Sequence, residues 1–170
     1  KALREYGTAT LVEVINSLGG LPTRNFSSGS FEDVSRISGE TLKGIIESRG
    51  GKMGHPCHPG CVIQCSNIYH DEAGNYLTSG LEYETIALIG SNCGIGSLDT
   101  IARLERFCDD FGLDTMEFGA ALGVAMEAGV LNFGDGRRAL ELCEEIEKGS
   151  YLDKILGHGA WVTGKVLGVR

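Results

Sequence analysis

Three cysteines fall within nine residues of this chain, in the run His55-Pro56-Cys57-His58-Pro59-Gly60-Cys61-Val62-Ile63-Gln64-Cys65. Two of the chain's three prolines and two of its four histidines lie in the same run. Cysteines this close together occur in metal sites and in disulfide knots, and either one constrains the local backbone strongly. Three neighbouring cysteines with one remote cysteine form a recurrent ligand set for a [4Fe–4S] cluster. The spacing therefore favours iron–sulfur binding by Cys57, Cys61 and Cys65.

Two other interpretations of the cysteine run stay open on spacing alone. A zinc site is one, with His55, His58 or His70 completing the ligand set. Disulfides or inert thiols are the other, because the chain has six cysteines, an even number. However, 170 residues of which 42% are apolar can bury a core without disulfide staples. We therefore expect reduced cysteines and a cytoplasmic protein.

The charge balance of the chain disfavours two classes of partner. The net charge is −8, and nucleic acids or anionic membranes attract clustered Lys and Arg instead. No apolar run approaches the roughly 18 residues that a membrane-spanning helix needs. The chain begins at Lys1 and not at methionine, so we expect it to be a segment of a longer polypeptide.

Apolar residues recur at helical spacing after residue 8, after residue 39 and from residue 80 to the end. Glycines separate these stretches. One β-hairpin is expected between them, with strands at 67–69 and 76–78 around the turn-forming residues 71–75. The sequence thus predicts one mostly α domain over residues 1–170, with one small hairpin.

Two short motifs combine carboxylates with helix ends. Glu82-Tyr83-Glu84-Thr85 opens a helix, where Ser79 and Glu82 resemble a capping box; one carboxylate could instead accept a proton in a pocket. Asp109-Asp110-Phe111-Gly112-Leu113-Asp114 joins two helices, and a C-cap at Gly112 with an N-cap at Asp114 explains that pattern. The same carboxylates could also accept hydrogen bonds from a ligand rich in N–H groups.

Four motifs, taken together and in order, resemble the tungsten-containing aldehyde ferredoxin oxidoreductases. They are Pro22-Thr23-Arg24-Asn25-Phe26, the run from Cys57 to Cys65, Glu82-Tyr83-Glu84-Thr85 with Gly90-Ser91-Asn92, and Asp109-x-x-Gly112-Leu113-Asp114. Each motif alone is weak, but the ordered set is specific and spans about residues 7–168. The resemblance implies the family's helical middle domain, without its amino-terminal β domain and its carboxy-terminal part.

The resemblance also implies roles for individual residues. Cys57, Cys61 and Cys65 match the ligands of a [4Fe–4S] cluster beside a tungsten centre held by two pterins. Glu82 or Glu84 is the implied proton acceptor. The implied pterin and cofactor contacts are Asp109, Gly112, Leu113, Asp114, Arg24 and Asn25. The reaction implied is oxidation of an aldehyde to a carboxylic acid, with electrons passing through the cluster to ferredoxin.

The chain departs from the family's pattern at the cysteines and at the dimer site. The family spacing is Cys-x2-Cys-x3-Cys, whereas here it is Cys57-x3-Cys61-x3-Cys65, and His58 stands where the first cysteine would fall. Either Cys57 or His58 is then the first ligand, and thiolate is the better ligand for a cluster. The Glu-x-x-His pattern that bridges subunits in some members is absent, so a homo-oligomer would form without that metal bridge.

Two further functions remain as alternatives to part of an oxidoreductase. One is a free-standing helical iron–sulfur module that draws a fourth ligand from Cys93, Cys108 or Cys143. The other is a structural zinc-binding domain without catalysis. The sequence does not identify the aldehyde substrate. It also does not distinguish tungsten from molybdenum, because the family's metal is held by pterin sulfurs and not by protein side chains. A chain holding three of four cluster ligands is expected to be inactive alone.

Overall fold

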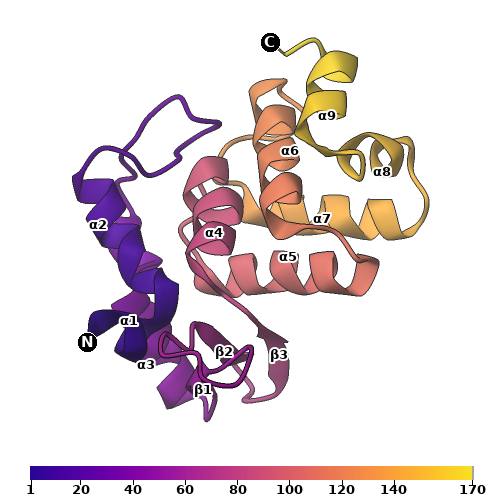
Figure 1. Cartoon of the computed structure of the whole chain (residues 1–170). Helices are drawn as coiled ribbons and strands as arrows, with labels where there is room; N and C mark the ends of the chain where they lie inside the picture. The colour runs from indigo at the N-terminus through magenta and orange to yellow at the C-terminus, as the bar shows by residue number, and fades with distance from the viewer. Residues whose placement is uncertain (170) are drawn as a thin grey trace.

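The computed structural model describes residues 1–169, apart from the side chains of residues 152–154. The predicted domain extends to Arg170, which lies outside the described residues. Short helices open the chain, a small sheet follows, and longer helices form the second half (Figure 1). The prediction of a mostly α fold with a small β element is confirmed.

The amino-terminal part consists of short helices, with a long irregular loop over residues 18–33. These are α1 (Ala2–Tyr6), η1 (Gly7–Thr10), α2 (Leu11–Ser17), η2 (Val34–Arg36) and α3 (Gly39–Ser48). The Ser38 hydroxyl caps α3 by accepting a hydrogen bond from the Thr41 amide at 3.2 Å. Leu42 and Ile46 on α3 are fully buried, and each such burial stabilises the fold by about 1.5–3 kcal/mol. This burial fixes α3 against the core directly before the cysteine run.

Three antiparallel strands in the order β1-β2-β3 form the sheet: β1 (Lys52–His55), β2 (Ser66–His70) and β3 (Tyr76–Ser79). The β2–β3 hairpin was predicted, and its turn closes where Asp71 Oδ1 accepts from the Asn75 amide at 2.8 Å. Strand β1 was not predicted. Its register shifts between Lys52 and His55, so it lacks the regular alternation that marks a strand. Residues 56–65, which are the cysteine run after His55, form the long connection from β1 to β2.

The second half begins with an irregular helical segment and continues as regular helices. The irregular segment is α4 (Tyr83–Thr85), a π-helical turn η3 (Ile86–Gly90) and a 3₁₀ turn η4 (Ser91–Cys93). The regular helices are α5 (Leu98–Phe111), α6 (Thr115–Glu127), α7 (Gly136–Glu147), α8 (Tyr151–Leu156) and α9 (Gly159–Leu167). No helix within the described residues is long and apolar enough to span a membrane.

The residues that cap the helices can be compared with the caps predicted from the sequence. The Asp114 carboxylate caps α6 by accepting from the Glu117 amide at 2.8 Å, and Gly112 is the C-cap of α5, as predicted. The predicted capping box of Ser79 with Glu82 is wrong, because Ser79 ends β3 and the Glu82 side chain makes no capping bond. Thr8 replaces it: its hydroxyl accepts from the Tyr83 amide at 3.1 Å. The start of α4 is therefore held by a tertiary contact and not by a local motif.

Among the described residues, polar contacts link α5 to Arg49, to β2 and to β3. Arg49, just after α3, pairs with Asp99 on α5, with Nη2 and Oδ2 3.1 Å apart. The Tyr69 hydroxyl on β2 donates to the same carboxylate at 2.9 Å. On β3, the Thr78 hydroxyl donates to the buried Glu105. A buried apolar cluster runs between the sheet and the helices, so these contacts border one continuous core.

Candidate metal and cofactor site

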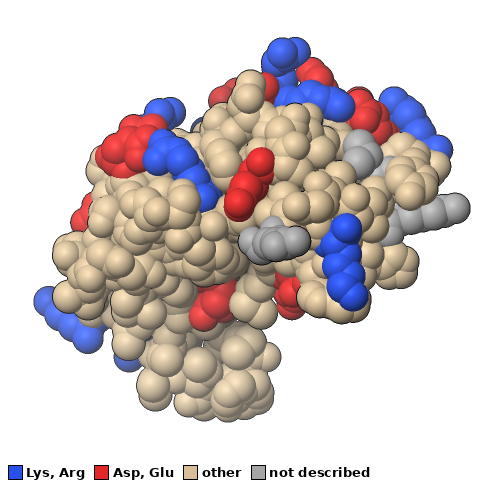
Figure 2. All heavy atoms as spheres, turned by 90° about the horizontal axis from the view of Figure 1, so that it is seen from above, with Lys and Arg blue, Asp and Glu red and all other residues tan. Residues whose placement is uncertain are grey.

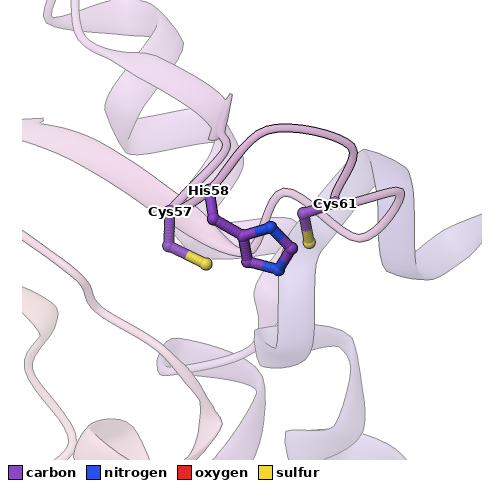
Figure 3. A group of neighbouring side chains, drawn as sticks. All are labelled: Cys57, His58 and Cys61. Carbon is purple, nitrogen blue, oxygen red and sulfur yellow. The ribbon is translucent and has the colours of Figure 1, made fainter.

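The cysteine run makes a tight turn at its centre. The Cys61 amide donates to the His58 carbonyl at 3.4 Å, and Gly60 has a φ of +84° after Pro59. Proline second and glycine with positive φ third is the pattern of a type II turn, which brings its first and fourth residues together. The side chains of Cys57, His58 and Cys61 therefore converge (Figure 3). One ligand atom from each lies within 4.8 Å of the other two.

The thiols of the run differ in their electrostatic surroundings. Backbone N–H groups of Gln64 and Ile63 lower the pKa of Cys61, because they stabilise its thiolate. Burial and the nearby Glu82 carboxylate raise the pKa of Cys65. These surroundings favour the thiolate at Cys61 and disfavour it at Cys65, where a bound metal would offset the effect of Glu82.

Cys65 connects the cysteine run to the Glu82 motif. Its backbone packs on Gly7, where an added Cβ would lie 2.9 Å from the Cys65 carbonyl oxygen. The next residue, Ser66, donates its hydroxyl to Glu82 Oε1 at 3.5 Å. The structure therefore brings together the predicted cluster ligand Cys65 and the predicted proton acceptor Glu82.

A cavity of about 360 Å³ lies beside this junction. Its lining includes Glu82 and Glu84, and across the cavity Thr115 and Met116 of α6. The hydroxyls of Thr85 and Thr115 are 2.9 Å apart, so they fix α4 against the start of α6. Glu82 is half-buried and Glu84 is exposed. Of the two predicted proton acceptors, Glu82 is the one held in a defined environment.

The turn from Asp109 to Asp114 borders a second cavity, of about 380 Å³. Gly112, Leu113 and Asp114 line one side, and His158 and Gly159 of the α8–α9 connection line the other. Asp109 and Asp114 are exposed, and one oxygen of Asp114 serves the α6 cap. Asp114 can therefore cap α6 and still line the cavity.

Arg24 and Asn25 lie in a strained loop. With Phe26 they have φ values of 46°, 51° and 60°, a left-handed run that costs about 1–3 kcal/mol per non-glycine residue. The Arg24 and Asn25 amides donate to the carbonyls of Ser91 and Asn92 at 3.1 and 2.9 Å. The structure thus joins the first predicted motif to Gly90-Ser91-Asn92.

The side chains of this loop already have acidic partners. Arg24 pairs with Glu32, and Asn25 donates to Glu127 at the end of α6. In Figure 1 the loop lies at the top, far from the cysteine run at the bottom. On the face seen from above in Figure 2, Lys and Arg lie next to Asp and Glu at several places along the upper edge, and uncharged residues cover most of the rest. Arg24 and Asn25 are therefore not brought together with Cys57, Cys61 and Cys65.

The family model "Aldehyde ferredoxin oxidoreductase, domains 2 & 3" matches residues 1–169. The chain belongs to the aldehyde ferredoxin oxidoreductase family. This family match confirms the resemblance seen in the sequence motifs, and it covers the cysteine run, both carboxylate motifs and the strained loop.

Curated relatives in this family are tungsten-containing aldehyde ferredoxin oxidoreductases. The protein from Thermococcus kodakarensis is 42% identical over 127 residues, and that from Pyrococcus abyssi is 39% identical over 132. The Pyrococcus horikoshii protein is 38% identical over 132 residues. In each case the match covers 74% of this chain and 20% of the relative. The chain thus spans about a fifth of the length of these relatives.

The remaining cysteines of this family member lie away from the loop. Cys93, Cys108 and Cys143 are buried among the helices, and all six cysteines are free thiols. Burial raises the pKa of all three, that of Cys143 to about 12. Cys93 is a small buried residue in a bend, and its Sγ lies 3.4 Å from the carbonyl oxygens of both Leu88 and Gly119.

Two groups near the site were missed in the sequence. Glu105 is 3% exposed, and burial raises its pKa to about 7. It follows Ile101 by four residues, so its place on the apolar stripe of α5 was the available signal. Thr115, directly after Asp114, gave no such signal, because its contact with Thr85 depends on the packing of α4 on α6.

Proposed function

We propose that this chain is the helical part of an aldehyde:ferredoxin oxidoreductase that holds an iron–sulfur cluster and one side of a pterin-bound metal site. One observation carries the proposal: three motifs that are distant in sequence adjoin in space. Cys65 lies beside Glu82, and Thr85 contacts Thr115, the residue after Asp114. A redox enzyme needs its electron-accepting cluster, its proton acceptor and its cofactor contacts close together.

The donor set of the cysteine run fits a [4Fe–4S] cluster. Cys57, Cys61 and Cys65 would be three ligands, and a fourth would come from elsewhere in the longer protein. The lowered pKa of Cys61 favours the thiolate that ligation requires. A cluster is larger than a single ion, so Cys65 need not join the close group of Cys57 and Cys61 to be a ligand. His58 stays an alternative to Cys57.

The turn from Asp109 to Asp114 fits the edge of a pterin. A pterin presents several N–H donors, and carboxylates are the acceptors that bind such donors most strongly. Asp114 uses one oxygen for its cap and keeps the other for a ligand. Gly112 leaves this side of the cavity open, and Leu113 adds apolar contact. To contact a cofactor, the side chains of Arg24 and Asn25 would have to leave their present partners, Glu32 and Glu127. The strained backbone of the two residues supports a functional role.

In the proposed reaction an aldehyde and water yield a carboxylic acid, two electrons and two protons. Tungsten or molybdenum held by two pterins supplies the two-electron oxidation, and the cluster supplies the one-electron steps to ferredoxin. Glu82 accepts a proton at its carboxylate oxygen, and the Ser66 hydroxyl orients that carboxylate. Glu84, exposed at the cavity's edge, is the second candidate acceptor. Free thiols throughout are in keeping with a reducing, cytoplasmic setting.

The test uses the full-length polypeptide that contains this chain, purified without oxygen. We expect about four irons and four acid-labile sulfides per chain, with tungsten or molybdenum alongside. Cys61→Ser should lower iron and sulfide together, while the matched control Cys143→Ala, a buried thiol outside the run, should leave both unchanged. Aldehyde-dependent viologen reduction then tests catalysis, which Glu82→Gln should lower without changing the metal content.

Zinc without sulfide in the full-length protein would contradict the proposal. Equal iron content in the Cys61 and Cys143 variants would contradict the ligand assignment. The 170-residue chain alone should not reduce viologen with an aldehyde, because it lacks the fourth cluster ligand; activity in that chain would point to a self-contained module.

A further inference from the structure

One buried carboxyl group takes no part in the proposed reaction. Glu105 lies on α5 and is 3% exposed, so water cannot solvate a charge on it. The uncharged hydroxyl of Thr78, the buried residue of β3, donates a hydrogen bond to its Oε2. An added Cβ at Gly80, which lines the cavity of Glu82, would lie 3.6 Å from its Oε1. One oxygen of Glu105 therefore faces Thr78 and the other faces Gly80, both on the segment that leads to Glu82.

The same side chain neighbours the motif that we propose as a pterin contact. Asp109 follows Glu105 by four residues, so the two side chains lie on one face of α5 with their Cβ atoms about 5–6 Å apart. Asp109 is exposed, whereas Glu105 is buried. The pKa of Glu105 is raised to about 7, first by burial and then by the charge of Asp109 and a side-chain hydrogen bond with it. The buried carboxyl group is therefore the one that keeps its proton in this pair.

The other titratable groups near Glu105 are already paired or neutral. Arg106, the next residue on α5, lowers the pKa of Glu105 by its charge, but its guanidinium pairs with another carboxylate of the same helix. Burial raises the pKa of the nearby Cys108 thiol. The buried faces of η3 and α6 carry no titratable side chain in the described structure, and that of α7 carries Cys143, whose pKa burial raises to about 12. Asp109 is therefore the acceptor that can use the proton of Glu105.

We propose that Glu105 is a positioning residue whose protonated carboxyl group donates a hydrogen bond to Asp109 and holds that carboxylate in place for the cofactor. The proposal rests on the proposed function, in which Asp109 accepts hydrogen bonds from a pterin. Thr78, Glu105 and Asp109 then form one chain, in which each hydroxyl donates to the next group. Loss of the Glu105 proton removes the donor and places two negative charges side by side, which repel each other. Cofactor binding should therefore weaken as the pH rises through about 7.

The first measurement does not depend on the cofactor. Infrared spectra of the full-length polypeptide that contains this chain, purified without oxygen, should show a protonated carboxyl band at pH 6 that is lost by pH 8. Glu105→Gln should lack this band, which assigns it to Glu105. Asp109→Asn replaces a charged acceptor by a neutral one, so the band should be lost at a lower pH than in the wild type. An unchanged titration in Asp109→Asn overturns the proposal.

The second measurement follows the cofactor in the same proteins. Pterin should leave the wild type about tenfold faster at pH 8 than at pH 6 during mild heating, which is the effect of losing one hydrogen bond to a charged group. Glu105→Gln keeps a donor for Asp109 and an acceptor for Thr78, so its release should be slow at both pH values. The matched control Glu141→Gln, which alters an exposed carboxyl group of α7, should keep the pH dependence of the wild type. The same dependence in Glu105→Gln overturns the proposal.

The two measurements separate this proposal from the proposed function. A full-length protein without pterin overturns the proposed function, and the infrared titration of Asp109→Asn then decides alone whether Glu105 is coupled to Asp109. A protein that contains pterin but shows an unshifted titration overturns the positioning role and leaves the proposed function standing.

Discussion

The cysteine run and the helical half of the chain are held by different forces. Helices α5 and α6 are fixed by caps at their starts and by buried side chains such as Leu104 and Leu122, both fully buried. In the cysteine run, Cys57 is exposed and Val62 is 80% exposed, so little apolar burial holds the chain. Its shape comes from one turn and from the strands at its ends. A loop built in this way can adjust to a metal without disturbing the core.

This difference predicts which part of the molecule a bound ligand should stabilise. A metal bound by the run would stabilise the sheet region, residues 49–79, far more than the helices, unless polar contacts transmit the effect between them. The described residues include such contacts: those of Arg49 and Tyr69 with Asp99, and that of Thr78 with Glu105. Each can be removed by a single substitution, and the resulting changes test how far the two regions are independent.

The largest effect is expected for Arg49→Ala. The Arg49 and Asp99 side chains are only 18% and 27% exposed, so removal of the cation leaves a largely buried carboxylate with Tyr69 as its remaining partner. Breaking a buried pair in this way costs about 3–5 kcal/mol, and partial exposure places this case near 3 kcal/mol. Denaturant unfolding should report the loss, and hydrogen exchange should rise first in the sheet region.

The matched control is Arg137→Ala, which removes an exposed pair with Glu141 on α7. The Arg137 side chain is 83% exposed, and such pairs contribute well below about 1 kcal/mol. A similar loss of unfolding free energy in both variants would show that the Arg49–Asp99 pair stabilises the protein no more than an exposed pair does. Uniform exchange throughout the Arg49 variant would show that the two regions unfold as one.

A smaller effect is expected at Glu105, whose contribution to stability should decrease with rising pH, whereas that of most carboxylates increases. Burial raises its folded-state pKa to about 7, above the ordinary value of 4.5. The folded state thus keeps a proton that the unfolded state has lost, so stability falls as the pH rises from about 4.5 through about 7. The loss is on the order of 2–3 kcal/mol.

Glu105→Gln removes that titration and keeps an acceptor for the Thr78 hydroxyl. The difference in unfolding free energy between wild type and variant should therefore shift in favour of the variant between pH 5 and pH 8. Comparing the two proteins cancels the titration of other groups. A difference that stays constant across this range would mean that Glu105 is ionised in the folded protein throughout.

The same contrast explains how much the sequence could predict. Local signals located the long helices, because the Asp114 cap and the Gly112 C-cap need only neighbouring residues. The hairpin was predictable for the same reason. The start of α4 was not, because its stabilising contact comes from Thr8, 75 residues away. The motifs also identified the family, but not that the loop carrying Arg24 lies apart from the cysteine run, or that His58 lies beside Cys57 and Cys61.

A smaller effect is expected for packing inside the helical half. Gly119 on α6 lies against the backbone of the π-helical turn, where an added Cβ would be 2.6 Å from the Leu88 carbonyl carbon. Backbone cannot rotate away as a side chain can, so Gly119→Ala should force α6 outward and cost about 1–3 kcal/mol. Thermal unfolding would measure the loss.

Gly44→Ala gives the opposite sign and completes the test. Gly44 lies inside α3 and has open space around it, so alanine should stabilise that helix by about 0.5–1 kcal/mol through its higher helix propensity. If both glycine variants lost stability, α3 would have to be packed more tightly than its open surroundings indicate. If neither changed, α6 would have room to move from the π-helical turn, and the helical half would be as adaptable as the cysteine run.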